Sequence, residues 1–375
     1  MLEDARSAVK VLKRVVAVTL AALPAALAAA AEPPPVALAP GFRIEIVADG
    51  LGAPRMLALD SSEALLVSMP SEGRVVALPV APRRDQLRSA VTVASGLHLP
   101  HGLAVRGRHL WVAETGRVVR FRYDPATHTA SEPVTIIPDL PPGAHHWTRS
   151  IALGPDGRLF VAIGSSCDIC RETDRRRAAI VSYALDGSKE RLVARGLRNP
   201  VGLAFEPRTG TLWTTVNERD WRDGRAPPDF LALVRDGANY GWPDCYAQAG
   251  ALAPDPEFRG VGDCRDVTLP SVELPSHAAP LGIAFYTGTR FPAAYRGNLF
   301  VALHGSRPAL PTTGYKIVRV VLGAGRPPRV EDFVTGWRVG DEIWGRPVDV
   351  LVGRDGALYV SDDHGGRVLR ITTMR

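Results

Sequence analysis

The hydrophobic and polar positions of this chain form one pattern that recurs six times. Each copy has a short apolar strand, a turn and a second apolar strand, and most copies add a further β segment after a loop. The six copies cover residues 56–69, 102–114, 150–164, 202–216, 282–303 and 349–363. The further segments cover residues 73–80, 116–124, 179–187, 315–323 and 366–373. Alternating apolar and β-branched positions separated by Pro-Asp-Gly and Arg-Asp-Gly turns predict strands throughout.

The recurrence predicts an all-β, six-bladed β-propeller. No segment after residue 31 shows a sustained helical period. Small sheets of about four strands cannot bury both faces alone, so six of them must close into a ring. A β-sandwich is the structural alternative, and the regular six-fold recurrence argues against it. The last copies lie further apart than the first ones, which indicates insertions, and such loops tend to carry function.

The first 31 residues have the parts of a secretory signal peptide. Four basic side chains lie within residues 5–14, and a short apolar run with small residues at its end follows over residues 15–31. This run contains Pro24 and is short for a membrane span. We expect cleavage near Ala31, which leaves residues 32–375 as a single propeller domain, periplasmic or secreted, with no membrane span. An uncleaved N-terminal anchor is the alternative.

Composition supports one folded domain and excludes a nucleic-acid partner. The chain has 375 residues, 46% hydrophobic and 22% charged, with 36 glycines and 32 prolines spread along it rather than collected in a linker. The net charge of +6 comes almost wholly from arginine, since lysine occurs only at positions 10, 13, 189 and 316. The arginines are scattered among 39 acidic residues and form no basic stripe.

Four cysteines bear on the compartment. An exported protein is expected to form disulfides, and three pairings of four cysteines are possible. Sequence proximity favours Cys167–Cys170 and Cys245–Cys264. The Cys-Asp-Ile-Cys motif is also compatible with a redox dithiol or a haem attachment, but Arg171 stands where haem attachment requires histidine.

Polar clusters occur where the predicted repeats begin or end, which on a propeller is around the central channel. They are His101, 145–147, 198–200, 217–220, 240–243, His277, 304–306, Lys316 and 346–347. Each cluster taken alone is also compatible with a turn, a cap or packing.

Several ordered motifs together resemble the glucose/sorbosone dehydrogenase family over residues 40–373. They are HHWTRSIALGPDGRLFVAIGSSCDIC, GLRNPVGLAFEP, NERD with PPDFL, NYGWP, HAAPLGIAFY, YRGNLFVALHGS with GYKIVRV, and GRPVDVLVGRDGALYVSDD. The resemblance implies a secreted six-bladed propeller that uses pyrroloquinoline quinone (PQQ) and calcium. It further implies an oxidoreductase that acts on a sugar or a related alcohol or aldehyde and passes electrons to an external acceptor, a cytochrome or the quinone pool.

The resemblance also implies roles for single residues. His146 matches the general base, a task that suits an imidazole because its pKa lies near neutrality. Arg198 and Asn199 match a pair beside the cofactor, where a guanidinium would stabilise negative charge on the quinone oxygen. Lys316 and Arg346 match positions that clamp the acidic groups of the cofactor. Lys316 also stands out because so few lysines occur after residue 31.

A calcium site is implied by an acidic segment, because calcium prefers carboxylate and carbonyl oxygens. Asp220 and Asp223 lie in the loop of residues 217–223, where the family holds the calcium of its cofactor, partly through backbone carbonyls. Asp229 and the backbone carbonyl of Tyr240 resemble a second, structural calcium site of the family. An ordinary acidic surface loop is the alternative.

The substrate pocket departs from the family pattern more than the cofactor pocket does. The substrate candidates are His101, His145, Trp147 and His304. His145 stands where the family has a sugar-binding aspartate, and Val201 stands where the glucose-oxidising branch has glutamine. We therefore do not expect glucose as substrate. Two other functions stay open: a metal-dependent propeller lactonase, and a binding propeller that has lost the cofactor.

Overall fold

Six antiparallel sheets follow one another along the chain. The computed structural model describes residues 36–80, 87–143, 145–221, 226–258, 263–308, 310–323 and 325–374. The first three sheets hold β3 (Leu57–Leu59), β4 (Leu65–Met69), β5 (Arg74–Leu78) and β6 (Val91–Ala94); β7 (Leu103–Arg106), β8 (His109–Ala113), β9 (Val118–Asp124) and β10 (Thr129–Ile137); and β11 (Arg149–Leu153), β12 (Leu159–Ile163), β13 (Ala179–Tyr183) and β14 (Arg191–Arg195). The next three hold β15 (Asn199–Phe205), β16 (Leu212–Asn217), β17 (Phe230–Leu233) and β21 (Val272–Glu273); β22 (Pro280–Phe285), β23 (Leu299–Leu303), β24 (Lys316–Gly323) and β25 (Arg326–Thr335); and β28 (Pro347–Val352), β29 (Leu358–Asp362), β30 (Arg367–Thr373) and β2 (Phe42–Ala48).

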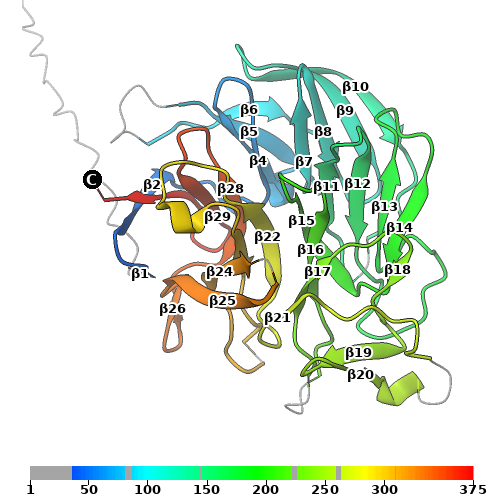
Figure 1. Ribbon diagram of the computed structural model, residues 1–375. Coiled ribbons are helices and arrows are strands. Elements are labelled where there is room, and N and C mark those ends of the chain that lie inside the picture. The colour runs from blue at the N-terminus through cyan, green and yellow to red at the C-terminus, as the bar shows by residue number, and fades with distance from the viewer. Residues whose placement is uncertain are drawn as a thin grey trace, which may run out of the picture. The chain divides into compact units, whose positions relative to one another are not determined.

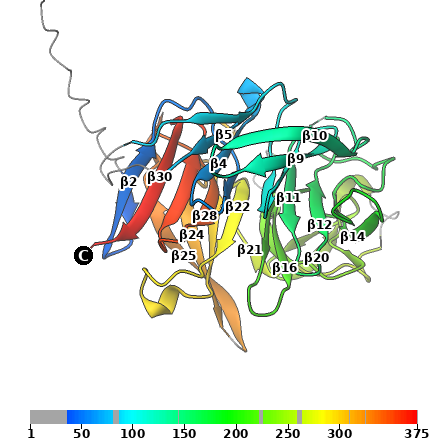
Figure 2. The ribbon, with the colours of Figure 1, turned by 90° about the horizontal axis from the view of Figure 1, so that it is seen from above.

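The sheets close into a ring, which confirms the predicted six-bladed propeller. The first strands of the six sheets each contact the first strand of the next sheet, and β28 contacts β3. The last sheet takes its outer strand from the N-terminal side, since β2 pairs antiparallel with β30 from Phe42 opposite Thr373 to Ala48 opposite Val368. Figure 2 shows this pairing as a blue strand beside a red one. The two ends of the described chain are thereby joined in one sheet.

The core lies between neighbouring sheets rather than at one centre. Side chains alternate across each strand, so that in β4 Leu65 and Val67 pack toward the sixth sheet and Leu66 packs toward the second. Both faces of a sheet are therefore buried, and the middle strands are almost wholly apolar. The largest of these clusters lies between the fifth and sixth sheets and contains Phe300 and Trp337.

Both predicted insertions are present (Figure 1). Between β17 and β21 the chain adds β18 (Ala238–Asn239), which extends the third sheet, and the hairpin of β19 (Cys245–Gln248) and β20 (Ala251–Pro254). Between β25 and β28 it adds the hairpin of β26 (Arg338–Val339) and β27 (Glu342–Ile343), and β1 (Ala37–Leu38) pairs with β25.

The helical content is small. Among the residues that the structure describes, three short 3-10 helices cover Pro70–Glu72, Pro256–Phe258 and Ala293–Tyr295. No helix in the described ranges is long and apolar enough to cross a membrane. The predicted signal peptide lies outside the described residues.

Candidate active site

Two cavities lie along the six innermost strands, and they differ in polarity. One, of about 420 Å³, is lined mainly by apolar residues within these strands, such as Leu57, Leu103 and Ile151. The other, of about 230 Å³, is lined largely by residues that precede or begin the innermost strands, or that end the strands next to them. Its polar and charged lining residues are Arg55, His146, Arg198, Asn199, Asn217, Glu218, Asp220, Asp229, His277, His304, Ser306, Arg307 and Arg346. We call it the polar cavity.

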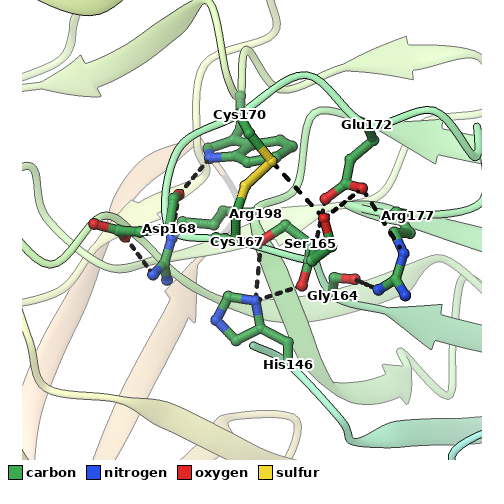
Figure 3. The surroundings of a disulfide bond; sticks show 11 residues. His146, Gly164, Ser165, Cys167, Asp168, Cys170, Glu172, Arg177 and Arg198 are labelled. Atoms are coloured by element: carbon green, nitrogen blue, oxygen red, sulfur yellow. Dashed lines mark hydrogen bonds and ion pairs between the residues drawn. A yellow bond between two sulfur atoms is a disulfide. The ribbon is translucent and has the colours of Figure 1, made fainter. Parts of the chain in front are cut away.

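His146 lies in the polar cavity with its tautomer fixed by Ser165 (Figure 3). Its Nδ1 lies 3.0 Å from the Ser165 carbonyl oxygen and 2.9 Å from Ser165 Oγ. The hydroxyl proton of Ser165 goes to the Cys167 carbonyl at 2.6 Å, so both Ser165 oxygens act as acceptors toward the imidazole. His146 Nδ1 therefore carries the proton, and Nε2 keeps a lone pair. Burial, followed by the charge of Arg198, holds the pKa of His146 well below 6.5.

Arg198 precedes β15 and is buried at the cavity wall. Its Nη2 donates to Asp168 Oδ1 at 2.6 Å and its Nε to the Asp168 carbonyl at 3.0 Å. Its Nη1 donates to the Asn217 carbonyl at 3.2 Å. Because a buried guanidinium needs a partner for its charge, Asp168 holds the side chain in one orientation.

Asn199 is brought against the loop of His146 by Gly164. A Cβ at position 164 would lie 2.4 Å from Asn199 Oδ1 and 2.5 Å from His146 Cβ, so only glycine permits this approach. Asn199 Oδ1 is buried and has no hydrogen-bond partner among the described residues. A buried acceptor without a partner costs free energy unless a ligand or water supplies a donor.

Arg346 gives the polar cavity a charge without a carboxylate partner in the described part of the chain. Its guanidinium donates to the carbonyls of His304, Gly305 and Ser306. Burial lowers the pKa of Arg346. A partly buried cation held only by carbonyls favours an anionic ligand.

A second histidine of the cavity lining, His304, is held by a carboxylate. His304 Nε2 lies 3.0 Å from Asp363 Oδ1, and Arg55 Nη1 lies 2.6 Å from Asp363 Oδ2. Burial lowers the pKa of His304 to about 4 although Asp363 opposes the shift. The imidazole is therefore neutral above that pH.

The structure brings Asp220 to the cavity among cations. Its carboxylate lies 3.8 Å from Arg198, 3.7 Å from Arg307 and 3.6 Å from His277 Nδ1. These partners hold Asp220 at the wall, where it offers oxygen atoms to a cation.

The other three predicted metal ligands, Asp229, Tyr240 and Asp223, are not positioned as Asp220 is or lie outside the described residues. Asp229 lines the cavity, but its two oxygens accept the N–H groups of Glu218 at 2.7 Å and Ala279 at 2.9 Å, and burial raises its pKa to about 7. Tyr240 packs in the core between the third and fourth sheets and is not among the cavity residues. Asp223 lies outside the described residues.

Lys316 is also absent from the polar cavity. It begins β24, the third strand of its sheet, and its Nζ pairs with Asp332 at 2.6 Å. Both residues line a separate depression of about 390 Å³. Third strands lie away from the propeller axis, so the structure puts this lysine outside the polar cavity although its motif matches a cofactor clamp.

The predicted substrate residues divide into two groups. His304 lines the cavity, and the His145 ring lies 4.6 Å from that of His146. His101 is fully buried beside Trp147, with the rings edge to face at 5.6 Å, and neither lines the polar cavity.

Sequence reasoning missed four residues of the site: Arg55, Arg307, Asp168 and Ser165. Asp168 lies within the Cys-Asp-Ile-Cys motif and Ser165 lies two residues before it, and the recognisable signal of this segment is its two cysteines. Arg55 and Arg307 belong to no recognisable motif, and single arginines do not stand out in an arginine-rich chain. Both predicted disulfides, Cys167–Cys170 and Cys245–Cys264, are present.

Comparison with known proteins gives the class of this site. The sequence model of the family described as TrAA12-like matches residues 36–374. The chain therefore belongs to this family, and the resemblance seen in the motifs is confirmed.

Several relatives are named as quinone-dependent sugar dehydrogenases. A pyrroloquinoline quinone-dependent pyranose dehydrogenase of Coprinopsis cinerea is 28% identical over 90% of this chain and 54% of its own length. A pyrroloquinoline quinone-dependent sugar dehydrogenase of Hypocrea jecorina is 26% identical over 90% of this chain and 89% of its own. The solved holo form of the PQQ domain of the Coprinopsis enzyme superposes with a TM-score of 0.76 at 26% identity, covering 91% of this chain and 98% of that domain. The chain spans 54–57% of the length of the first curated relatives that it matches.

Proposed function

We propose that this protein is a PQQ-dependent oxidoreductase that oxidises a sugar or a related alcohol or aldehyde. The polar cavity carries the proposal, because it fits an acidic cofactor. PQQ bears three carboxyl groups, and the cavity offers Arg55, Arg198, Arg307 and Arg346. Among the described residues the hydrogen bonds of the Arg346 side chain go only to carbonyls, and Asn199 has a buried oxygen free to accept a donor. Family membership and the named relatives support the same cofactor.

Two residues are placed to do the chemistry. PQQ, when bound, supplies an acceptor for the hydride of the substrate C–H bond. His146 Nε2, unprotonated because Nδ1 donates to Ser165, takes the proton of the substrate hydroxyl. The low pKa of His146 keeps this nitrogen free to act as base. Arg198 lies at the same wall and stabilises negative charge that develops there.

Calcium is the second part of the cofactor proposal. Asp220 is our candidate ligand, since it lines the cavity and its carboxylate lies near Arg198, Arg307 and His277 among the described residues. Asp229, whose oxygens are taken by backbone amides, is better suited to hold the loop than to ligate the ion.

An exported location is the third part. Two disulfides account for all four cysteines, which fits an oxidising compartment. With the signal-peptide pattern of residues 1–31, this supports a periplasmic or secreted enzyme, with residues 32–375 as one propeller domain. A cytochrome or the quinone pool is the proposed electron acceptor.

The test is reconstitution of the purified apoprotein with PQQ and calcium. We expect a saturable absorbance change on PQQ addition and dye reduction with a panel of aldoses, other alcohols and aldehydes. His146→Gln should retain PQQ binding but lose turnover by about 10²–10⁴-fold, as expected for a general base. Arg346→Gln should weaken PQQ binding instead.

The matched control is Arg265→Gln. Arg265 is an exposed arginine that pairs with Asp263 far from the cavity lining. It should bind PQQ as the wild type does. The proposal would be refuted if the wild type did not bind PQQ, or if Arg346→Gln and Arg265→Gln lost the same PQQ affinity.

The lactonase alternative is less well supported. That reaction requires several carboxylate and amide ligands around one metal. The one group of three metal-ligating side chains in the described ranges is Cys167, Cys170 and Glu172, and its two cysteines are joined in a disulfide.

A further inference from the structure

The Cys167–Cys170 disulfide closes a short loop that contacts Arg198 directly and His146 through Ser165 (Figure 3). On one side, Asp168 accepts from Arg198 through its carboxylate at 2.6 Å and through its carbonyl at 3.0 Å. The same carbonyl accepts Trp242 Nε1 at 3.1 Å. The carboxylate and the carbonyl of Asp168 therefore both point toward Arg198, which requires a defined backbone turn between Cys167 and Cys170.

On the other side, the loop reaches His146 through Ser165. Ser165 Oγ donates to the Cys167 carbonyl at 2.6 Å and lies 2.9 Å from His146 Nδ1. The backbone N–H of Ser165 donates to the Arg198 carbonyl at 2.8 Å. Ser165 therefore connects the proposed base, His146, to Arg198, and its hydroxyl is held by the Cys167 carbonyl.

The loop is held by polar contacts rather than by apolar packing. Besides the bonds above, Ser166 bonds to Glu172, the N–H of Asp220 donates to Asp168 Oδ1 at 3.2 Å, and Arg171 pairs with Asp244 at 2.5 Å. Ser165 is buried, but no residue from 166 to 172 is, so the loop lacks an apolar anchor in the core. A loop without core burial is ordered by covalent closure and by its hydrogen bonds. Opening the disulfide would free the Cys167 carbonyl and Asp168 together.

We infer that the Cys167–Cys170 loop is a positioning element in which Ser165 fixes the tautomer of His146 and Asp168 fixes the orientation of Arg198. The inference rests on the proposed function of these two residues. Reduction of the disulfide by a dithiol consumes two electrons and two protons, yields two cysteine thiols and converts the dithiol to its own disulfide. The loop then opens and both side chains lose their fixed orientation, although the propeller core stays intact.

The test compares two pairs of substitutions in the full-length protein. One variant carries Cys167→Ser with Cys170→Ser, and the control carries Cys245→Ser with Cys264→Ser. The second disulfide closes a longer loop, with a sequence separation of 19 against 3, so its loss should lower Tm more. We expect the opposite order for kcat, with about a 10–100-fold loss for the first pair and little change for the control.

The side-chain ¹⁵N spectrum of histidine gives a readout that does not depend on PQQ or activity. In the wild-type apoprotein His146 should show the tautomer protonated at Nδ1, with the signal assigned from its loss in His146→Gln. The first cysteine pair should average the two tautomers, and the control pair should leave the signal unchanged. Ser165→Ala should weaken the tautomer preference, and Ser165→Thr, which keeps the hydroxyl, should restore it.

Two results would overturn the inference. One is an unchanged His146 tautomer and unchanged kcat in the variant that lacks Cys167–Cys170. The other is a loss of kcat that simply follows the loss of Tm in both pairs. If the wild type shows no PQQ-dependent turnover, the proposed function fails, but the tautomer measurement still decides the positioning role.

Discussion

Asp349 joins the two blades at which the propeller closes. It lies on β28 of the sixth sheet, is 5% exposed, and accepts the N–H of Leu57 on β3 at 2.8 Å and that of Val350 at 2.9 Å. Burial raises its pKa from 3.8 to about 7, although both amides and Arg55 oppose the shift. The perturbation that tests this is Asp349→Asn, which keeps the shape and removes the titration.

The sign and size of the effect follow from linkage. Below pH 3.8 the carboxyl is protonated in both states, and above about pH 7 it is ionised in both. Between these values the unfolded chain loses the proton while the folded chain keeps it, so the free energy of unfolding falls as pH rises. A shift of about three units corresponds to about 4 kcal/mol. Asp229, with a pKa also raised to about 7, contributes a second fall of the same sign.

The assay is urea unfolding followed by tryptophan fluorescence at pH 4, 5.5, 7 and 8. The carboxamide cannot accept from both amides, so the variant should lose about 1–3 kcal/mol at pH 4. Between pH 4 and 8 its stability relative to the wild type should then rise by about 4 kcal/mol. Asp341→Asn, at a fully exposed position, should not alter the pH dependence. If the free energies of unfolding of Asp349→Asn and the wild type differed by the same amount from pH 4 to 8, Asp349 would be ionised throughout this range. The two amide hydrogen bonds would then lower its pKa by as much as burial raises it.

Three further predictions concern the site and the core. The acidic limb of kcat/KM against pH should lie below 6.5, because burial keeps His146 neutral at lower pH, and a limb above that value would contradict the pKa direction. Chelation with EGTA should weaken PQQ binding in an absorbance titration, with recovery on adding calcium but not magnesium, and unaltered affinity would remove calcium from the proposal. Phe300→Ala should lower the free energy of unfolding by about 3–5 kcal/mol, since Phe300 is fully buried between two blades. Val339→Ala, at a position 63% exposed, should change it by no more than about 0.5 kcal/mol, and equal effects in urea unfolding would refute this packing argument.

Some of the site could be predicted from the sequence because its residues come from motifs with local order. His146, Arg198, Asn199 and Arg346 each begin an innermost strand or precede one by at most three residues, and a propeller brings all such positions to one end of its axis. Lys316 belonged to an equally recognisable motif but begins a third strand, and the fold places it in a different depression. Whether a motif residue lies in the polar cavity therefore depends on the distance of its strand from the axis.

The long-range part of the site could not be predicted. Arg55 and Asp363 are 308 residues apart in sequence and meet at 2.6 Å because the ring closes between the sixth and first blades. Asp168 lies between two cysteines and has no sequence signal of its own, and only the structure shows that its carboxylate and its carbonyl both accept from Arg198.

The sequence by itself determined the strands, the six repeats, the disulfide pairing and the family. These are encoded locally, in the alternation of apolar positions, the turn residues and the spacing of the cysteines. Only the tertiary structure decided which charges converge, which histidines face the cavity and which are buried behind it. The physical reason is that closing six sheets into a ring fixes distances between segments that no local pattern relates.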